Sequence, residues 1–263
     1  MASRTRPFAA FEFLIAWRYL RARRAEGGVS VMTWISLVGI ALGVMALVST
    51  LAVRAGFRAE FVDTILGANA HVTVYRGSYV DEQGVTTRGM ADFAEVRDRV
   101  AAVPGVTRAA PVVRGQAMVT LNDRSNVAEV YGISLGDLKT IPRVAGSSEA
   151  LGDIERFGEG IAVGSGIARD LGLMVGDKVK LISPSGAKTA FGVSPRVNAY
   201  EVVYIFSAGR WDIDRTRIYM PMAEAQSYFN REGVADEIEI FVTDPEQVDD
   251  WTEPLLVAAG EGA

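Results

Sequence analysis

Few side chains in this sequence are able to carry out acid–base, nucleophilic or metal chemistry. His71 is the one histidine and cysteine is absent, which removes multi-histidine and thiolate metal sites, disulfides and cysteine nucleophiles. Because it follows a predicted turn, His71 is expected to form a structural hydrogen bond. Asp212 and Asp214 form a D-x-D pair in WDIDR, but two carboxylates without further ligands indicate a surface turn rather than a metal site.

The glycines of GEGIAVGSG, residues 158–166, could suggest a phosphate-binding loop. Neither the G-x-x-x-x-G-K-[ST] motif nor the G-x-G-x-x-G motif is present in this stretch. The sequence as a whole presents no set of residues for covalent or acid–base catalysis. We therefore expect a protein that is not an enzyme and that has no cofactor and no resident metal.

The composition indicates a folded chain of which part meets lipid. Of 263 residues, 49% are hydrophobic and 22% are charged, so the chain buries enough apolar surface to offset the entropy of ordering. Its net charge of −5 is unevenly distributed, because six arginines and two acids precede Gly27. A basic arm of this kind could bind nucleic acid, but the rest of the chain carries no basic stripe, so no nucleic-acid partner is expected.

Residues 27–53 contain no charged residue and predict one transmembrane helix. At about 1.5 Å per residue such a helix reaches about 40 Å, enough to cross a hydrocarbon core of about 30 Å. A cleaved signal peptide is the alternative, but its apolar region would be about 7–15 residues long and would end at a site of small residues. The arginines before the helix predict that the N-terminus is cytoplasmic and that residues 54–263 lie outside the cytoplasm.

Two further features belong to this part of the chain. In the basic leader, residues 1–26, Phe13 and Trp17 recur at helical spacing, which is typical of a helix along the inner membrane surface or of a plain juxtamembrane anchor. Within the predicted span, Gly39 and Gly43 form a G-x-x-x-G pair, which allows another helix to approach closely. Glycine is also common in membrane helices that make no such contact.

Residues 54–263 alternate strand and helix signals and predict an α+β domain. The expected strands are 70–75, 107–113, 116–121, 127–133, 198–206 and 237–242, and the expected helices are 90–103, which Pro104-Gly105 ends, and 245–259. Residues 158–229 are expected to form a subdomain inserted into the layer that the other elements build.

One segment of the predicted insert lacks a regular pattern. Ser165 is expected to cap a short helix that Gly172 ends, before a strand at 178–182. Residues 183–197, SPSGAKTAFGVSPRV, then have turn residues at both ends and an apolar Phe191 in the middle. An apolar residue on an exposed loop indicates a recognition element, and a tip folded back on its own domain is the alternative.

The joined features resemble the lipoprotein-releasing permeases of the LolC/LolE type, membrane subunits of an ABC transporter in Gram-negative bacteria. The stretches that carry the resemblance cover nearly the whole chain: AWRYLRARRAEGGVSVMTWISLVGIALGV in the leader and helix, Gly56-Phe57-Arg58 at the helix exit, ILGANAHVTV from Ile65 to Val74, and IAVGSGIARDLGL, VGDKVKLISP and IYMPMAEAQ in the insert. The leader and insert motifs are specific rather than generic.

The resemblance implies a fold, a domain order and a location. Such permeases have a first transmembrane helix, a MacB-like periplasmic core domain with an inserted subdomain, and then three more transmembrane helices with a cytoplasmic coupling segment. The expected location is the inner membrane, with the main domain in the periplasm. This chain has no second apolar run between Val53 and Ala263, so the resemblance implies a truncated permease or a fragment that does not transport alone.

The resemblance also assigns a binding element to the irregular segment. In the LolC-like branch a hairpin called the hook, with a neighbouring basic pad, grips a periplasmic lipoprotein chaperone of the LolA type. Here the hook corresponds to Thr189, Ala190, Phe191, Gly192, Val193, Ser194, Pro195 and Arg196, and Lys180 stands where the pad has a basic residue. The tip proline of the family pattern is Ala190 here and its later polar pair is Val197-Asn198, so the sequence departs from the pattern mainly in the pad.

The implied mechanism is mechanical. A separate ATPase subunit would move the helices of this permease and of a second permease copy or paralogue, so that lipoprotein acyl chains leave the membrane lipids for the chaperone. The expected lipid-facing residues at the outer end of the helix are Val48, Leu51, Val53 and Phe57. The alternatives are a different ABC permease with a MacB/FtsX-like periplasmic domain, and a single-span envelope scaffold or sensor.

Overall fold

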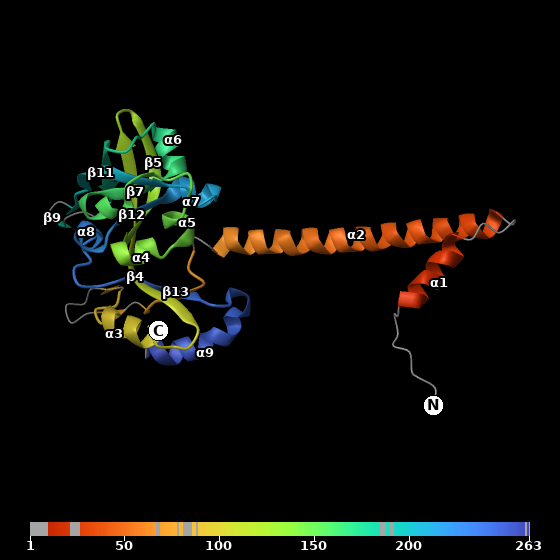
Figure 1. The fold of residues 1–263 in the computed structure, drawn as a ribbon. Coiled ribbons are helices and arrows are strands. Elements are labelled where there is room, and N and C mark those ends of the chain that lie inside the picture. The colour runs from red at the N-terminus through yellow and green to blue at the C-terminus, as the bar shows by residue number, and fades with distance from the viewer. Residues whose placement is uncertain are drawn as a thin grey trace. The chain divides into compact units, whose positions relative to one another are not determined.

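The chain forms two compact units, residues Met1–Glu60 and Phe61–Ala263 (Figure 1). The computed structural model describes residues 10–21, 27–66, 69–77, 79–80, 86–87, 89–184, 188–189, 192–260 and 262.

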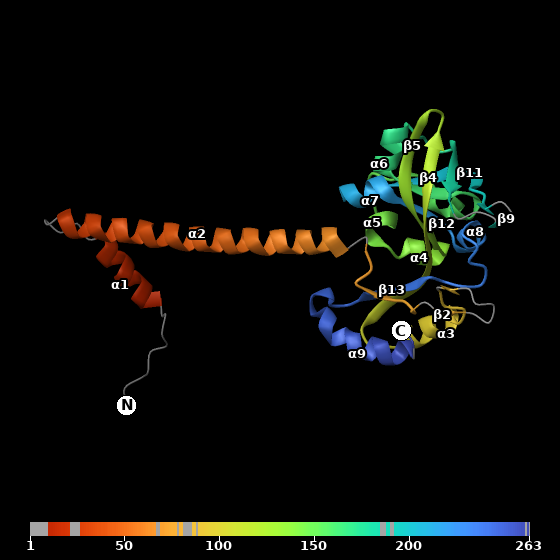
Figure 2. The same cartoon turned by 180° about the vertical axis from the view of Figure 1, so that it is seen from behind.

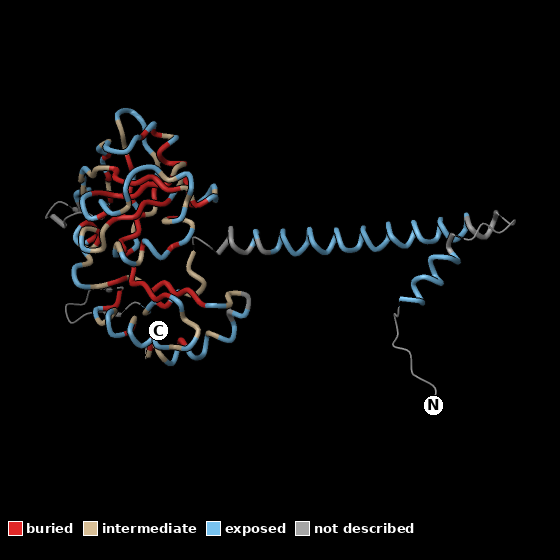
Figure 3. Tube along the Cα trace, viewed as in Figure 1, coloured by how far each residue is buried: buried red, intermediate tan, exposed pale blue. Residues whose placement is uncertain are grey.

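The first unit is helical. Helix α1 covers Ala10–Arg21 and helix α2 covers Gly27–Leu66, whose last turns belong to the second unit. The stretch Val31–Arg58 of α2 is long and apolar enough to cross a membrane, and its residues are exposed (Figure 3). The helix begins where the charge-free run begins but continues past Val53, because the charged residues that follow are good helix formers and no proline interrupts them.

The second unit contains two lobes, seen from both sides in Figures 1 and 2. In the first lobe, strands β1 (Val72–Val74), β13 (Glu237–Val242) and the first half of β4 (Val106–Leu121) form an antiparallel layer. Helices α3 (Phe93–Ala101) and α9 (Val248–Ala259) cover one face of that layer and bury Val96, Val100, Leu255 and Ala259 against Ile238 and Ile240. The short strands β2 (Tyr79–Val80) and β3 (Thr86–Thr87) pair with each other, and η2 (Pro245–Gln247) precedes α9.

The second lobe is a sheet that closes on itself. Its strands are the second half of β4, then β5 (Arg124–Ile133), β12 (Arg217–Pro221), β7 (Ile161–Gly164), β11 (Arg196–Phe206) and β8 (Lys178–Ser183), and β8 pairs back to β4. The pairs β5 with β12 and β7 with β11 are parallel and the other pairs of the ring are antiparallel. Strand β6 (Leu151–Gly152) adds to β11 outside the ring.

Short helices close the second lobe and divide its core into two clusters. One cluster, which includes Val119, Val130, Leu181 and Ile218, packs against α6 (Ser165–Leu171) and α8 (Met222–Tyr228). The other cluster, centred on Tyr131, Phe206 and Tyr219, packs against α4 (Leu135–Lys139), α5 (Pro142–Ala145), η1 (Ile154–Glu159) and α7 (Trp211–Thr216). The α+β fold class is therefore confirmed.

The structure differs from the sequence-based expectations in how the segments combine. Segments 107–113 and 116–121 form the single strand β4, and residues 116–133 lie in the second lobe together with 158–229 rather than in the layer with β13. The second lobe thus begins within β4 and not at residue 158. The alternation of apolar residues predicts a strand but carries no information on its partner, which depends on distant segments.

Individual capping predictions had mixed outcomes. The N-cap of α6 is Gly164 and no side chain caps it, so the expected cap by Ser165 is wrong; Ser165 is the first helical residue. The helix ends at Gly172 with φ +72°, a left-handed conformation, as predicted. WDIDR forms helix α7 and not a surface turn, and Asp214 within it is buried.

We predict that Gly132→Ala destabilises the second unit. A Cβ at position 132 of β5 would lie 2.2 Å from the Cβ of Ala225 in α8, so the helix must move away from the sheet. Overpacking of this kind costs about 1–3 kcal/mol, measured as the free energy of unfolding in urea. Gly158→Ala is the matched control, because nothing lies within 4 Å of a Cβ there, and it should change stability by less than about 0.5 kcal/mol. Equal effects of the two changes would contradict the packing argument.

Candidate functional site

The irregular segment predicted at 183–197 contains a short hairpin. Strands β9 (Lys188–Thr189) and β10 (Gly192–Val193) pair antiparallel, with Gly192 opposite Thr189 and Val193 opposite Lys188. Ala190 and Phe191, the predicted tip residues, lie outside the described residues. The hairpin belongs to the connection between β8 and β11, at the edge of the second lobe (Figure 1).

The remaining hook residues lead back into the ring. Ser194 and Pro195 are exposed, and Arg196 is half-buried and begins β11, opposite Ser183 at the end of β8. The guanidinium of Arg196 donates to the carbonyl oxygen of Ser227 and, at 2.8 Å, to Oδ1 of Asn230. Arg196, predicted as a partner contact, is thus bound to its own domain.

Lys180, the predicted pad residue, lies on the outer face of β8. Its side chain is exposed and its strand neighbours are Ala199 on β11 and Thr120 on β4. Side chains directly opposite one another in a sheet stand on the same face. Lys180 therefore stands on the outer surface of the ring, two residues along β8 from Ile182.

An exposed row of apolar side chains crosses the ring beside Lys180. Met118 on β4 is opposite Val127 on β5 and opposite Ile182 on β8, and Ile182 is opposite Val197 on β11. Val127 is 63%, Val197 53% and Met118 40% exposed. We call these four residues the apolar row. The apolar row runs directly beside the base of the hairpin. Ile182 and Val197 are paired in the β8–β11 ladder, next to the pair of Ser183 and Arg196 from which the hairpin begins.

The predicted helix residues are accessible in this chain. Val48, Leu51, Val53 and Phe57 are exposed on α2, and nothing lies within 4 Å of a Cβ built on Gly39 or Gly43. Their contacts with lipid or with a second helix stay predictions.

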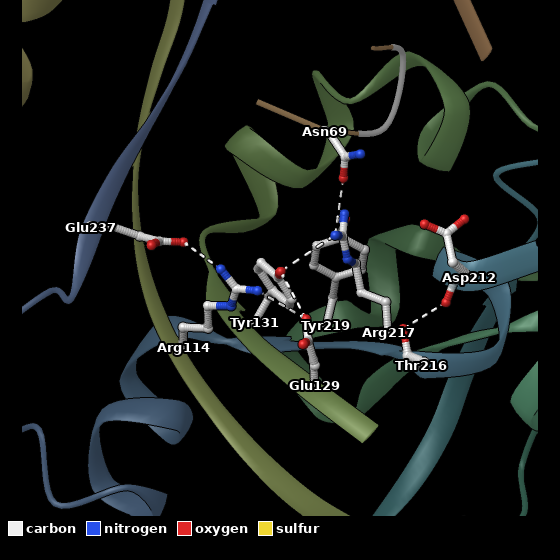
Figure 4. Close-up of polar contacts among 9 residues, drawn as sticks. All are labelled: Asn69, Arg114, Glu129, Tyr131, Asp212, Thr216, Arg217, Tyr219 and Glu237. Atoms are coloured by element: carbon white, nitrogen blue, oxygen red, sulfur yellow. Dashed lines mark hydrogen bonds and ion pairs between the residues drawn. The ribbon is translucent and has the colours of Figure 1, made fainter. Parts of the chain in front are cut away.

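A buried polar cluster that the sequence analysis did not single out joins the two lobes (Figure 4). Arg217, at the start of β12, donates to Oδ1 of Asn69 at 3.1 Å, to the Tyr131 hydroxyl at 3.3 Å and to the Tyr219 hydroxyl at 3.4 Å. Its guanidinium also lies 4.4 Å from the centre of the Tyr131 ring. Asn69 precedes β1, so this arginine binds the segment that follows α2 to the second lobe.

Charged side chains of β4 and β13 extend the cluster into the first lobe. Arg114 contacts Glu129 at 3.1 Å and Glu237 at 3.7 Å, and Arg108 contacts Glu239 at 3.7 Å. Burial raises the pKa of Glu239, which the positive charges of Arg108 and Arg217 oppose. Burial also raises the pKa of Tyr131, again against the charge of Arg217. The Tyr131 hydroxyl donates to Oε2 of Glu129 at 3.2 Å, so the cluster links charged and polar side chains of both lobes.

The other residues considered for chemistry have structural roles. The backbone N–H of Val242 donates to Nδ1 of His71 at 3.1 Å, which confirms a structural hydrogen bond, and burial lowers the pKa of this histidine. Asp214 accepts the N–H of Ala208 at 2.7 Å, whereas Asp212 pairs with Arg210 at 2.6 Å. No group of three or more His, Asp or Glu side chains within the described part of the chain could hold a metal ion.

The glycine-rich stretch serves close packing. A Cβ on Gly164 would lie 2.4 Å from the carbonyl oxygen of Asp214, and one on Gly166 would lie 2.8 Å from the same atom. The glycines thus allow β7 and α6 to approach the backbone of α7.

With the fold and the site described, comparison with known proteins identifies the family. The model of the MacB-like periplasmic core domain matches residues 33–255. The periplasmic region of MacB from Actinobacillus actinomycetemcomitans is a similar solved structure, with 11% identity, a TM-score of 0.45 and coverage of 72% of this chain and 84% of that one. The chain belongs to the family of the MacB-like periplasmic core domain. The matched residues include most of the stretch Val31–Arg58, which is long and apolar enough to span a membrane.

Curated relatives confirm the predicted resemblance to permeases of the LolC/LolE type. The chain is 30% identical to the lipoprotein-releasing system transmembrane protein LolC of Neisseria meningitidis serogroup B, over 97% of this chain and 60% of that protein. It is 27% identical to the corresponding LolE of Haemophilus influenzae, over 82% of this chain and 51% of that protein. The chain therefore spans about 60% of the length of the LolC relative.

We predict that Arg217→Met destabilises the second unit by about 3 kcal/mol or more, because the Tyr131 and Tyr219 hydroxyls and Asn69 lose their buried donor. Arg114→Met is the matched control. The Arg114 side chain is 46% exposed, so its ion pairs should contribute about 0–1 kcal/mol. Urea unfolding followed by tryptophan fluorescence measures both free energies. A loss for Arg217→Met no larger than that for Arg114→Met would contradict a structural role of the cluster.

Proposed function

We propose that this chain is part of a membrane subunit of an ABC transporter that releases lipoproteins from the inner membrane and passes them to a periplasmic chaperone. The observation that carries the proposal is its 30% identity, over 97% of its length, with a protein named as a lipoprotein-releasing transmembrane protein. The β9–β10 hairpin supports it, because it lies in the segment where the resemblance expects the hook. The subunit is non-catalytic, and a separate ATPase subunit supplies the energy.

In the membrane, we propose two kinds of contact for α2. The small-residue face at Gly39 and Gly43 accommodates a close helix of the second permease copy or paralogue, because no atom of the described residues lies within 4 Å of a Cβ built on either glycine. The exposed residues at the outer end, Val48, Leu51, Val53 and Phe57, contact membrane lipid and the acyl chains of the lipoprotein substrate.

In the periplasm, we propose that the hairpin tip and the apolar row bind the chaperone together. A chaperone that shelters acyl chains presents an apolar groove, and the Phe191 side chain supplies an anchor of matching chemistry. The apolar row continues that surface beside the base of the hairpin. Lys180 stands next to the row, where a solvated charge affects the association rate more than the affinity.

The proposed orientation has a cytoplasmic N-terminus and a periplasmic main domain, because arginines concentrate before α2. We predict that alkaline phosphatase fused after Thr243 is active, since this enzyme folds only outside the cytoplasm. The same enzyme fused after Arg21, before the span, should be inactive. A fluorescent cytoplasmic reporter that is bright after Thr243, with a silent phosphatase at the same site, would overturn the orientation.

We predict that Phe191→Asp weakens binding of the chaperone at least about thirtyfold, as loss of a central apolar anchor does. Biolayer interferometry with the full chain in lipid nanodiscs measures the affinity. Met174→Asp is the matched control, because Met174 is an apolar residue that is 73% exposed and lies outside the hairpin, and it should leave the affinity unchanged. Unaltered binding by Phe191→Asp would favour a permease of another specificity.

A further inference from the structure

The base of the hairpin is attached to the core much more firmly than the residues beside it. Ser183 and Tyr228 are each only 1% exposed, whereas Ser194 and Pro195 are exposed. The Tyr228 ring packs edge-on against Phe229, with 4.9 Å between ring centres. The chain therefore changes from core to solvent within one or two residues on either side of the pair formed by Ser183 and Arg196.

Arg196 is the side chain that connects this base to a second element. Its guanidinium donates to Ser227 in α8 and to Asn230 just beyond that helix, and its carbonyl oxygen lies 3.5 Å from the Tyr228 hydroxyl. A planar guanidinium that bonds two acceptors at once is fixed in orientation as well as position. The two bonds use two of the five N–H donors of the guanidinium and direct it toward α8.

We propose that Arg196 is a positioning residue that presets the direction of the hook and does not itself contact the chaperone. The proposal rests on the proposed function of the hairpin. Its physical basis is entropy: a segment that is already ordered loses less conformational freedom when it binds, so it binds more tightly through the same contacts. Arg196 acts through the residues at the tip, which provide the contacts.

The first test needs no partner. Hydrogen exchange of the free full chain in nanodiscs should be at least about tenfold faster in residues 184–195 of the Arg196→Ala variant than in the unaltered chain, with the melting temperature and the exchange of β13 unchanged. Arg156→Ala is the matched control, because Arg156 bonds Glu201 at 3.1 Å at a distance from the hairpin along β11. Unchanged exchange in residues 184–195 overturns the proposal, whatever the hairpin binds.

The second test separates positioning from contact. Asn230→Ala keeps Arg196 but removes one of its acceptors, so positioning predicts weaker chaperone binding, whereas direct contact predicts unchanged or tighter binding. Weakening should be independent of salt, since no charge pair with the partner is lost. Tighter or unaltered chaperone binding by Asn230→Ala contradicts the proposal. If neither the unaltered chain nor any variant binds the chaperone, the proposed function is refuted instead.

The third test replaces the arginine by a covalent link. Ser183 and Arg196 are directly opposite in the β8–β11 pair, at a separation that suits a disulfide, and the chain has no other cysteine. The Ser183→Cys/Arg196→Cys variant should recover chaperone affinity to within about threefold of the unaltered chain when oxidised and lose it when reduced. If mass spectrometry shows the disulfide and binding stays weak, Arg196 is a contact residue and the proposal is wrong.

Discussion

Strand β4 is the one described element whose backbone hydrogen bonds belong to both lobes. Along its first half it pairs with β13, and along its second half with β5 and β8. Buried peptide groups must be paired, so neither lobe can complete its sheet without this strand. The polar cluster around Arg217 and Arg114 lies where the two sets of pairings meet, and it fixes side chains of β5, β12 and β13 against one another.

Closure of the second lobe explains why its proposed recognition surface takes the form of a hairpin and a row. A ring of paired strands offers no free edge to a partner, so binding must use outward side chains or a segment that leaves the ring. Both occur together at β8 and β11: Ile182 and Val197 face outward, and the chain between them forms β9 and β10. The same ladder that completes the ring also holds the base of the hairpin.

Local features of the fold could be predicted from the sequence, and long-range ones could not. The charge-free run predicted where α2 begins, the alternating pattern predicted β13 at its observed bounds, and Gly172 predicted the end of α6. The sharing of β4 between lobes depends on pairing with segments more than fifty residues away in the chain, which periodicity does not encode. The sequence analysis missed Arg217 because a single charged residue before IYMP is typical of a strand boundary. Two of its partners, Asn69 and Tyr131, are also distant from it in the sequence.

For the candidate site, the composition singled out a segment, and the structure shows the contacts that its described residues make. Turn residues around an apolar centre singled out 183–197, but whether Arg196 points outward or inward depends on Ser227 and Asn230, which no spacing rule connects to it. The apolar row could not be predicted from the sequence either, because its four residues come from four different strands.

The described residues after α2 contact the two lobes in turn, and this order determines how the segment would respond to tension. Asn69 is bonded to β12 of the second lobe, whereas the N–H of His71 donates to Ile240 at 2.9 Å and β1 continues along β13 of the first lobe. A pull transmitted along the chain from the helix would reach the contact of Asn69 with Arg217 before the ladder of β1, in which several backbone hydrogen bonds share the load. Under such a pull, the hydrogen bond between Arg217 and Asn69 would break before the strand pairing of β1 with β13 does.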